Sequence, residues 1–219
     1  MPSKLKKLLV LYKIKRVMNT PTQKIDSIGP VGETGDTQPE KSQAQLDYAE
    51  GRGYVERGEA ALAAVALHNA LRGFEEENNR EGIANASNQL GHACLLREEF
   101  DKALIHYRKA WEICEELGDH ISLLSVTKSL AEAHKGLGEY RRALDLCLDL
   151  LDSYQKNNDP KNSVDMLERM AEIYVAANEK LRAADAYKTA ASIHANFGHT
   201  AVAESLRGKA DELLESSED

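Results

Sequence analysis

Seven histidines and three cysteines are the side chains in this 219-residue sequence that are best suited to acid–base or nucleophilic chemistry. A catalytic or metal site needs such residues grouped at defined spacings. The histidines are scattered, and the sequence contains no HExxH, GxSxG or GxxxxGK[ST] pattern. We therefore predict a non-catalytic protein without a cofactor or a bound metal ion.

The three cysteines, Cys94, Cys114 and Cys147, are odd in number and form no CxxC pair. This pattern argues against a disulfide framework and favours a reducing compartment. Each cysteine falls on an apolar stripe, which predicts an inert core thiol. No apolar run approaches the roughly 20 residues that span a bilayer, and none suits a signal peptide. We expect a cytoplasmic protein, which its N-terminus could place at the inner face of a membrane.

Charge divides the chain into a basic N-terminal arm and an acidic remainder. The whole chain carries a net charge of −8, yet residues 1–18 contain no acid. An acidic body is a poor nucleic-acid binder, whereas the arm could meet anionic lipid or an acidic protein surface, including a groove of its own molecule. Its apolar and basic residues do not separate on a helical wheel, so a solvated tail stays an alternative. The basic residues of the arm are Lys4, Lys6, Lys7, Lys13, Lys15 and Arg16.

Residues 19–43 are predicted to be a flexible linker, because three prolines and three glycines interrupt any continuous helix there.

From residue 44 onward the sequence repeats itself with a period of 40. Small residues recur at Gly51, Gly91, Ala131 and Ala171, and a glutamate recurs at Glu59, Glu99, Glu139 and Glu179. Within each copy, apolar residues at spacings of three and four predict two amphipathic helices. We expect an all-α domain over 44–214, with repeats at 44–79, 80–119, 120–159 and 160–199. A capping helix at 200–214 and an acidic tail at 215–219 would follow.

Turn and cap residues agree with this division. Gly58, Gly138 and Asn178 stand between the paired helices and tolerate a left-handed backbone, although Glu98 departs from the pattern. Asn79, Asp119 and Asp159 are good N-caps for the following helix. Small residues such as Gly91 are expected to face Ala103 and its equivalents, which would let paired helices approach closely.

The chain resembles the tetratricopeptide repeat family. Leu90-Gly91, Cys94, Ala103, Tyr107 and Ala110 carry the match, together with their equivalents forty residues on either side. The repeats are six residues longer than the family's 34. They are similar to the extended repeats of kinesin light chains and of bacterial pheromone-binding regulators. The resemblance implies a right-handed α-solenoid in which the first helix of each pair lines a concave groove that binds a peptide or a helix.

The groove positions of the family map onto polar residues of mixed charge. Amides such as Asn88 suit pairing with a peptide backbone, and the charges predict a groove that is basic towards its N-terminal end and acidic towards its C-terminal end. Surface charges that only solvate an exposed face are the simpler interpretation. The candidate partner-binding residues are Tyr48, Arg52, Asn85, Asn88, His92, Ser125, Lys128, Glu132, Glu168 and Glu172.

The favoured function is thus a protein-interaction scaffold or adaptor that binds a peptide or a partner segment. The alternatives are a self-assembling or membrane-surface protein driven by residues 1–18, with a possible homo-oligomer, and a regulator whose superhelical pitch changes when a small peptide binds.

Overall fold

The structure, a computed structural model, describes residues 41–216, and these form helices joined by short turns, with no strand among them. The basic arm, and the predicted linker as far as residue 40, lie outside the described residues. The helices are α2 (Gln43–Glu56), α3 (Ala60–Glu76), α4 (Arg80–Leu95), α5 (Phe100–Leu117), α6 (His120–Gly136), α7 (Tyr140–Lys156), α8 (Pro160–Ala176), α9 (Lys180–Asn196) and α10 (Thr200–Glu215).

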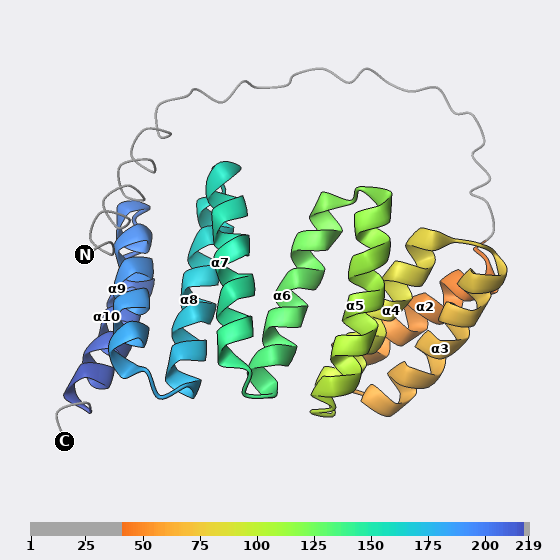
Figure 1. Ribbon diagram of the computed structural model, residues 1–219, viewed down its shortest axis with the longest axis horizontal. Helices are drawn as coiled ribbons and strands as arrows, with labels where there is room; N and C mark the ends of the chain where they lie inside the picture. The colour runs from red at the N-terminus through yellow and green to blue at the C-terminus, as the bar shows by residue number, and fades with distance from the viewer. Residues whose placement is uncertain (1–40, 217–219) are drawn as a thin grey trace, which may run out of the picture.

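Each helix packs against the next one along the chain, so the helices form a single row from α2 to α10 (Figure 1). The even-numbered helices are the first members of the predicted pairs and the odd-numbered helices are the second members. Buried side chains lie in successive clusters along the row instead of in one central core. The predicted α-solenoid of four helix-turn-helix repeats with a C-terminal capping helix is confirmed.

Each turn between paired helices has a residue with a left-handed backbone conformation at the predicted position. Glu98 adopts a φ of 57° where the equivalent residues are Gly58, Gly138 and Asn178, so the repeat imposes this geometry on a residue type that disfavours it. The side chains of Asn79, Asp119 and Asp159 accept hydrogen bonds from the backbone N–H of the third residue of the following helix, as predicted.

Gly91 determines how closely α4 approaches α5. A Cβ atom at this position would lie 2.4 Å from Cε1 of Tyr107, a side chain with no exposed surface. The atoms nearest to this position belong to an aromatic ring one turn beyond Ala103, the residue that Gly91 was expected to face. Because Gly91 has no side chain, the aromatic ring of Tyr107 can pack directly against the backbone of α4.

Both ends of the described stack are polar. On α2, Glu50 is exposed at the position where Leu90, Leu130 and Met170 are buried. On α10, Asp211 stands where the first helices carry Gly or Ala, and it pairs with Lys188 of α9. At the α10 end, this polar face disfavours the stacking of a further repeat.

Candidate partner-binding surface

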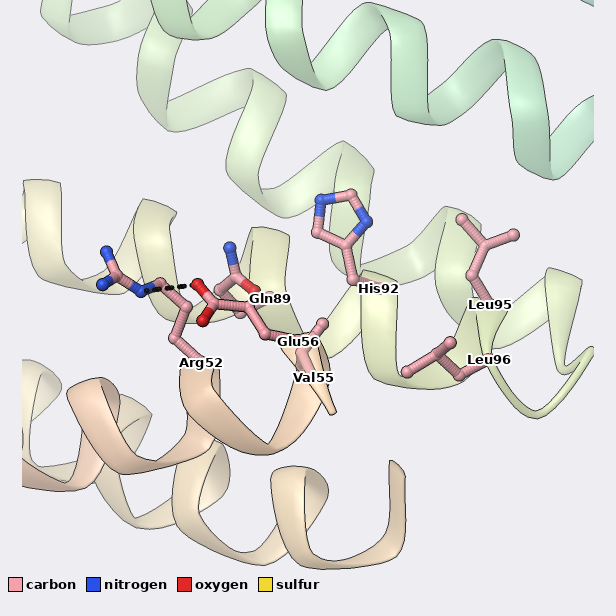
Figure 2. Close-up of a pocket in the computed structure, with 7 residues that line it drawn as sticks. All are labelled: Arg52, Val55, Glu56, Gln89, His92, Leu95 and Leu96. Atoms are coloured by element: carbon pink, nitrogen blue, oxygen red, sulfur yellow. Dashed lines mark ion pairs between the residues drawn. The ribbon is translucent and has the colours of Figure 1, made fainter. Parts of the chain in front are cut away.

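A shallow pocket of about 470 Å³ lies between α2 and α4, the first helices of repeats one and two. Figure 2 shows its lining residues, which α2 and α4 contribute from facing turns. Arg52 and His92 were predicted groove residues, and the structure brings them to this one pocket. The full lining is Arg52, Val55, Glu56, Gln89, His92, Leu95 and Leu96.

The pocket combines an apolar side with a charged rim. Leu96 is about half exposed, and Val55 and Leu95 are partly buried beside it. At the rim, Arg52 Nε lies 3.4 Å from Glu56 Oε1, and both side chains are more than half exposed. Because exposed ion pairs of this kind are weak, Arg52 can exchange Glu56 for a carboxylate on a partner at little cost.

His92 lies at the pocket as a hydrogen-bonding group and not as a cation. Its Nδ1 is 2.9 Å from the hydroxyl oxygen of Tyr107 on α5, and burial lowers the pKa of His92 below its ordinary value. The imidazole is therefore neutral at pH 7. Of the cations predicted for this end of the groove, Arg52 alone carries a charge at the pocket.

Three carboxamides lie on the same face of α4. Asn85 is exposed, whereas Asn88 and Gln89 are partly buried. The Oδ1 atom of Asn88 is buried and has no hydrogen-bond partner among the described residues. Leaving a buried acceptor unpaired costs about 1–3 kcal/mol. Rotation of the side chain towards solvent or towards a donor on a partner would recover that free energy.

Most predicted groove residues of α6 and α8 are held by other side chains of the chain. Lys128 Nζ lies 3.1 Å from Asn162 Oδ1 and 3.2 Å from Asp165 Oδ2, and it sits 5.2 Å from the ring centroid of Tyr154 on α7. This lysine thus connects three helices and is only about a quarter exposed. It is held by the protein itself and is not free to meet a carboxylate.

The acids of this region are also matched by cations. Glu132 pairs with Lys135 and Arg169, and Lys135 also reaches Glu172 of α8 at 3.5 Å. Glu168 lies 3.3 Å from Nε2 of His194 on α9. The predicted acidic half of the groove therefore contains interspersed cations, so its charges are largely compensated within the chain.

Tyr48 and Ser125 lie at the margins of this surface. Tyr48 is half-buried and packs edge-on against Phe74, with ring centroids 6.3 Å apart, so it contributes mainly to the core. Ser125 is exposed on α6, and its carbonyl oxygen accepts a hydrogen bond from the Ser129 hydroxyl.

The pocket residues that the sequence analysis missed follow a simple rule. Glu56, Gln89 and Leu96 stand four residues after the predicted positions Arg52, Asn85 and His92, and Val55 and Leu95 stand three residues after Arg52 and His92. Side chains three or four apart share one helix face, so this spacing could have identified them. Lys135 and Arg169 could not be found in this way, because their roles depend on side-chain reach between helices.

The remaining candidate chemistry is sparse in the part of the chain that the structure describes. Between residues 41 and 216, no three His, Cys, Asp or Glu side chains are placed to hold a metal ion. Cys114 and Cys147 are buried, and burial raises the pKa of the Cys147 thiol to about 11. Among the same residues, no helix is long and apolar enough to cross a membrane.

Comparisons with known proteins agree with this architecture. Residues 82–156 match the sequence model of the family described as tetratricopeptide repeat. No curated protein sequence matches the chain significantly. A Podosopora anserina putative kinesin light chain with nearly identical TPR-like repeats has a similar solved structure, with a TM-score of 0.62 and 17% identity, over 80% of this chain and 94% of that one.

Two further solved structures are similar. The apo form of RapI has a TM-score of 0.56 at 12% identity, over 84% of this chain and 87% of that chain. BtubC (BKLC) from P. vanneervenii has a TM-score of 0.53 at 14% identity, over 81% and 93%. At such identities the likeness concerns the fold. The sequence match places tetratricopeptide repeats at residues 82–156, and the structural likeness shows that the described helices share the fold of such repeat proteins.

Proposed function

We propose that the chain is a non-catalytic adaptor that binds an extended peptide or partner segment along the face of its first helices, with the α2–α4 pocket as the principal contact. The observation that carries this proposal is the unpartnered Oδ1 of Asn88, one residue before the pocket-lining Gln89; this atom is buried in the free chain and has to turn outward to meet a donor. A peptide N–H is the donor that this acceptor lacks. Extended segments present such donors regularly along their length.

The chemistry of the pocket supports a ligand of a definite kind. Val55, Leu95 and Leu96 provide apolar area for one side chain of the ligand. Arg52 offers an exposed cation at the rim for a carboxylate close to that side chain. The expected ligand therefore places an apolar residue near an acidic one.

The internal pairing of Lys128, Lys135 and Arg169 favours a structural role for the α6–α8 part of the face. A ligand that used these residues would have to break interactions the chain already makes. Binding through α2 and α4 requires no such exchange beyond the weak Arg52–Glu56 pair.

Selection from a displayed library of random 12-residue peptides, with the full chain as bait, tests this proposal. The selected peptides should bind the double variant Arg52→Glu/Asn88→Ala at least 10-fold more weakly, as measured by isothermal titration calorimetry. The matched control is Arg142→Glu on α7, since Arg142 is a similarly exposed arginine in a surface ion pair. Enrichment of no peptide, or equal affinity for the double variant and the native chain, would contradict the proposal.

The membrane-surface alternative depends on residues 1–18, and their charge of +6 supports it as a second candidate. It predicts that the full chain sediments with anionic vesicles and that a chain lacking those residues does not. Absence of sedimentation for the full chain removes this candidate.

A further inference from the structure

One face of α2 has no partner among the described residues, although the same face is covered in every later first helix. Ala86, Val126, Met166 and Leu206 occupy equivalent positions and are at most 3% exposed. They pack towards the second helix of the preceding pair. Leu46 stands at this position in α2 and is 48% exposed.

The residues around Leu46 make this face acidic as well as apolar. Asp47 and Glu50 replace Ser87 and Leu90 of the next repeat. Among the described residues, their carboxylates bond to neighbours on the same helix, since Gln43 donates to Asp47 and the Tyr54 hydroxyl donates to Glu50. The face therefore presents one large apolar side chain flanked by two carboxylates.

We propose that residues 1–18 of the same chain dock on this face and take the place of the missing second helix. This segment is the basic and apolar part of the sequence, with six cations, no acid and the run Leu8-Leu9-Val10-Leu11. Its lysines complement Asp47 and Glu50, and its leucines complement Leu46. Docking continues the interface that already repeats along the stack.

The mixed pattern of the segment also suits this face better than it suits a lipid surface. Membrane-surface helices separate their basic and apolar residues onto opposite faces. In residues 1–18, Lys4 and Lys15 fall beside Leu8 and Leu11 on a helical wheel. The α2 face has carboxylates and a leucine within one helix turn, so it can contact neighbouring lysines and leucines of such a segment at the same time.

The connection between the segment and α2 is long enough for docking. Residues 19–42 join them, and a coil of that length has a root-mean-square span of about 25–30 Å. Neighbouring helices lie only about 10 Å apart. The tether gives the segment an effective concentration in the millimolar range at this face, so even weak individual contacts suffice for occupancy.

Carbodiimide cross-linking of the full chain, followed by peptide mass spectrometry, tests the proposal, because this reagent joins only a lysine and a carboxylate that touch. Residues 1–18 should cross-link to Asp47 or Glu50 within a single chain. Glu204 and Glu212 on α10, at the opposite end of the stack, serve as internal controls and should form no such link.

The apolar contribution is tested by Leu46→Ser, which should lower the yield of the Asp47 and Glu50 cross-links at least 5-fold. Leu62→Ser on α3 is the matched control, since Leu62 is 51% exposed, and this substitution should leave the yield unchanged. The groove variant Arg52→Glu/Asn88→Ala should also cross-link normally, so failure of the proposed function and failure of this inference give different results.

Three outcomes would overturn the inference. The first is the absence of any link from residues 1–18 to Asp47 or Glu50. The second is a link found only between two chains, which would make the occupant a second copy. The third is a link that is lost at physiological salt while the segment becomes bound to vesicles of phosphatidylcholine and phosphatidylserine.

Discussion

At the scale of single residues, packing determines which of the glycines within helices are required. Gly91 faces the ring of Tyr107, whereas Gly208 of α10 has no atom within 4 Å of where its Cβ would lie. Gly91→Ala should therefore lower the free energy of unfolding by about 1–3 kcal/mol through overpacking. Gly208→Ala should raise it by about 0.5–1 kcal/mol through helix propensity. Urea unfolding followed by circular dichroism measures both, and changes of the same sign would contradict the packing account.

The second residue-scale prediction concerns pH. Burial lowers the pKa of His92 in the folded chain, so the unfolded chain binds its proton at a higher pH. Because of this linkage, the contribution of His92 to the free energy of unfolding is present in full above the unfolded pKa of about 6.5. It decreases as the pH falls below that value. Between pH 7 and 5.5 we expect a loss of up to about 1 kcal/mol per pH unit from this residue.

His92→Gln is the variant that isolates this effect, because an amide can keep the hydrogen bond to Tyr107. Its free energy of unfolding should depend less on pH over that window. His106 on α5 contributes in the same direction, since burial lowers its pKa too, so some pH dependence will persist. Identical slopes for the variant and the native chain would show that His92 is not the linked group.

At the scale of helices, the caps explain where each first helix begins. Asp119 accepts hydrogen bonds from Ser122, and these bonds lower its pKa. His199 holds the equivalent position before α10 and makes no side-chain cap. Asp119→Ala should cost about 1 kcal/mol of stability, and His199→Asp should add about 0.5–1 kcal/mol. Thermal unfolding at pH 7 distinguishes these signs, and a destabilising His199→Asp would count against the cap assignment.

The helices themselves were predictable from the sequence because their signals are local. Apolar stripes, N-caps such as Asp159 and turn residues such as Gly138 each act within a few residues. The surface was less predictable because its chemistry arises between helices. Neither the capture of Lys128 by Asn162 and Asp165 nor the neutral state of His92 follows from a helical wheel, since both depend on a neighbouring helix.

At the scale of the whole molecule, stability is expected to build up between neighbouring pairs. The last interface is formed by α10, which buries Ala203, Leu206 and Ala210. A chain ending at residue 199 should lose at least about 2 kcal/mol of stability and associate through the exposed face of α9. Light scattering after size exclusion detects the association, and a chain ending at residue 214 is the control. A shortened chain that stays monomeric and equally stable would refute the capping role.

The pairing of polar side chains differs between two parts of an otherwise regular array. Repeats one and two leave Arg52 exposed and the Oδ1 of Asn88 without a hydrogen-bond partner among the described residues, whereas repeats three and four use their charged residues to hold α6 to α8. The same repeat can thus carry exposed polar side chains in one part of the array and interhelical ion pairs in another.

The most direct test of the account follows the side-chain amide NMR signals of Asn85, Asn88 and Gln89 while a library-selected peptide is added to the full chain. We predict that the Asn88 signals shift most and that the Asn162 signals, held by Lys128 and Asp159, stay in place. Shifts confined to residues of the second helices α3, α5, α7 and α9, with Asn88 unchanged, would contradict the claim that the face of α2 and α4 receives the partner.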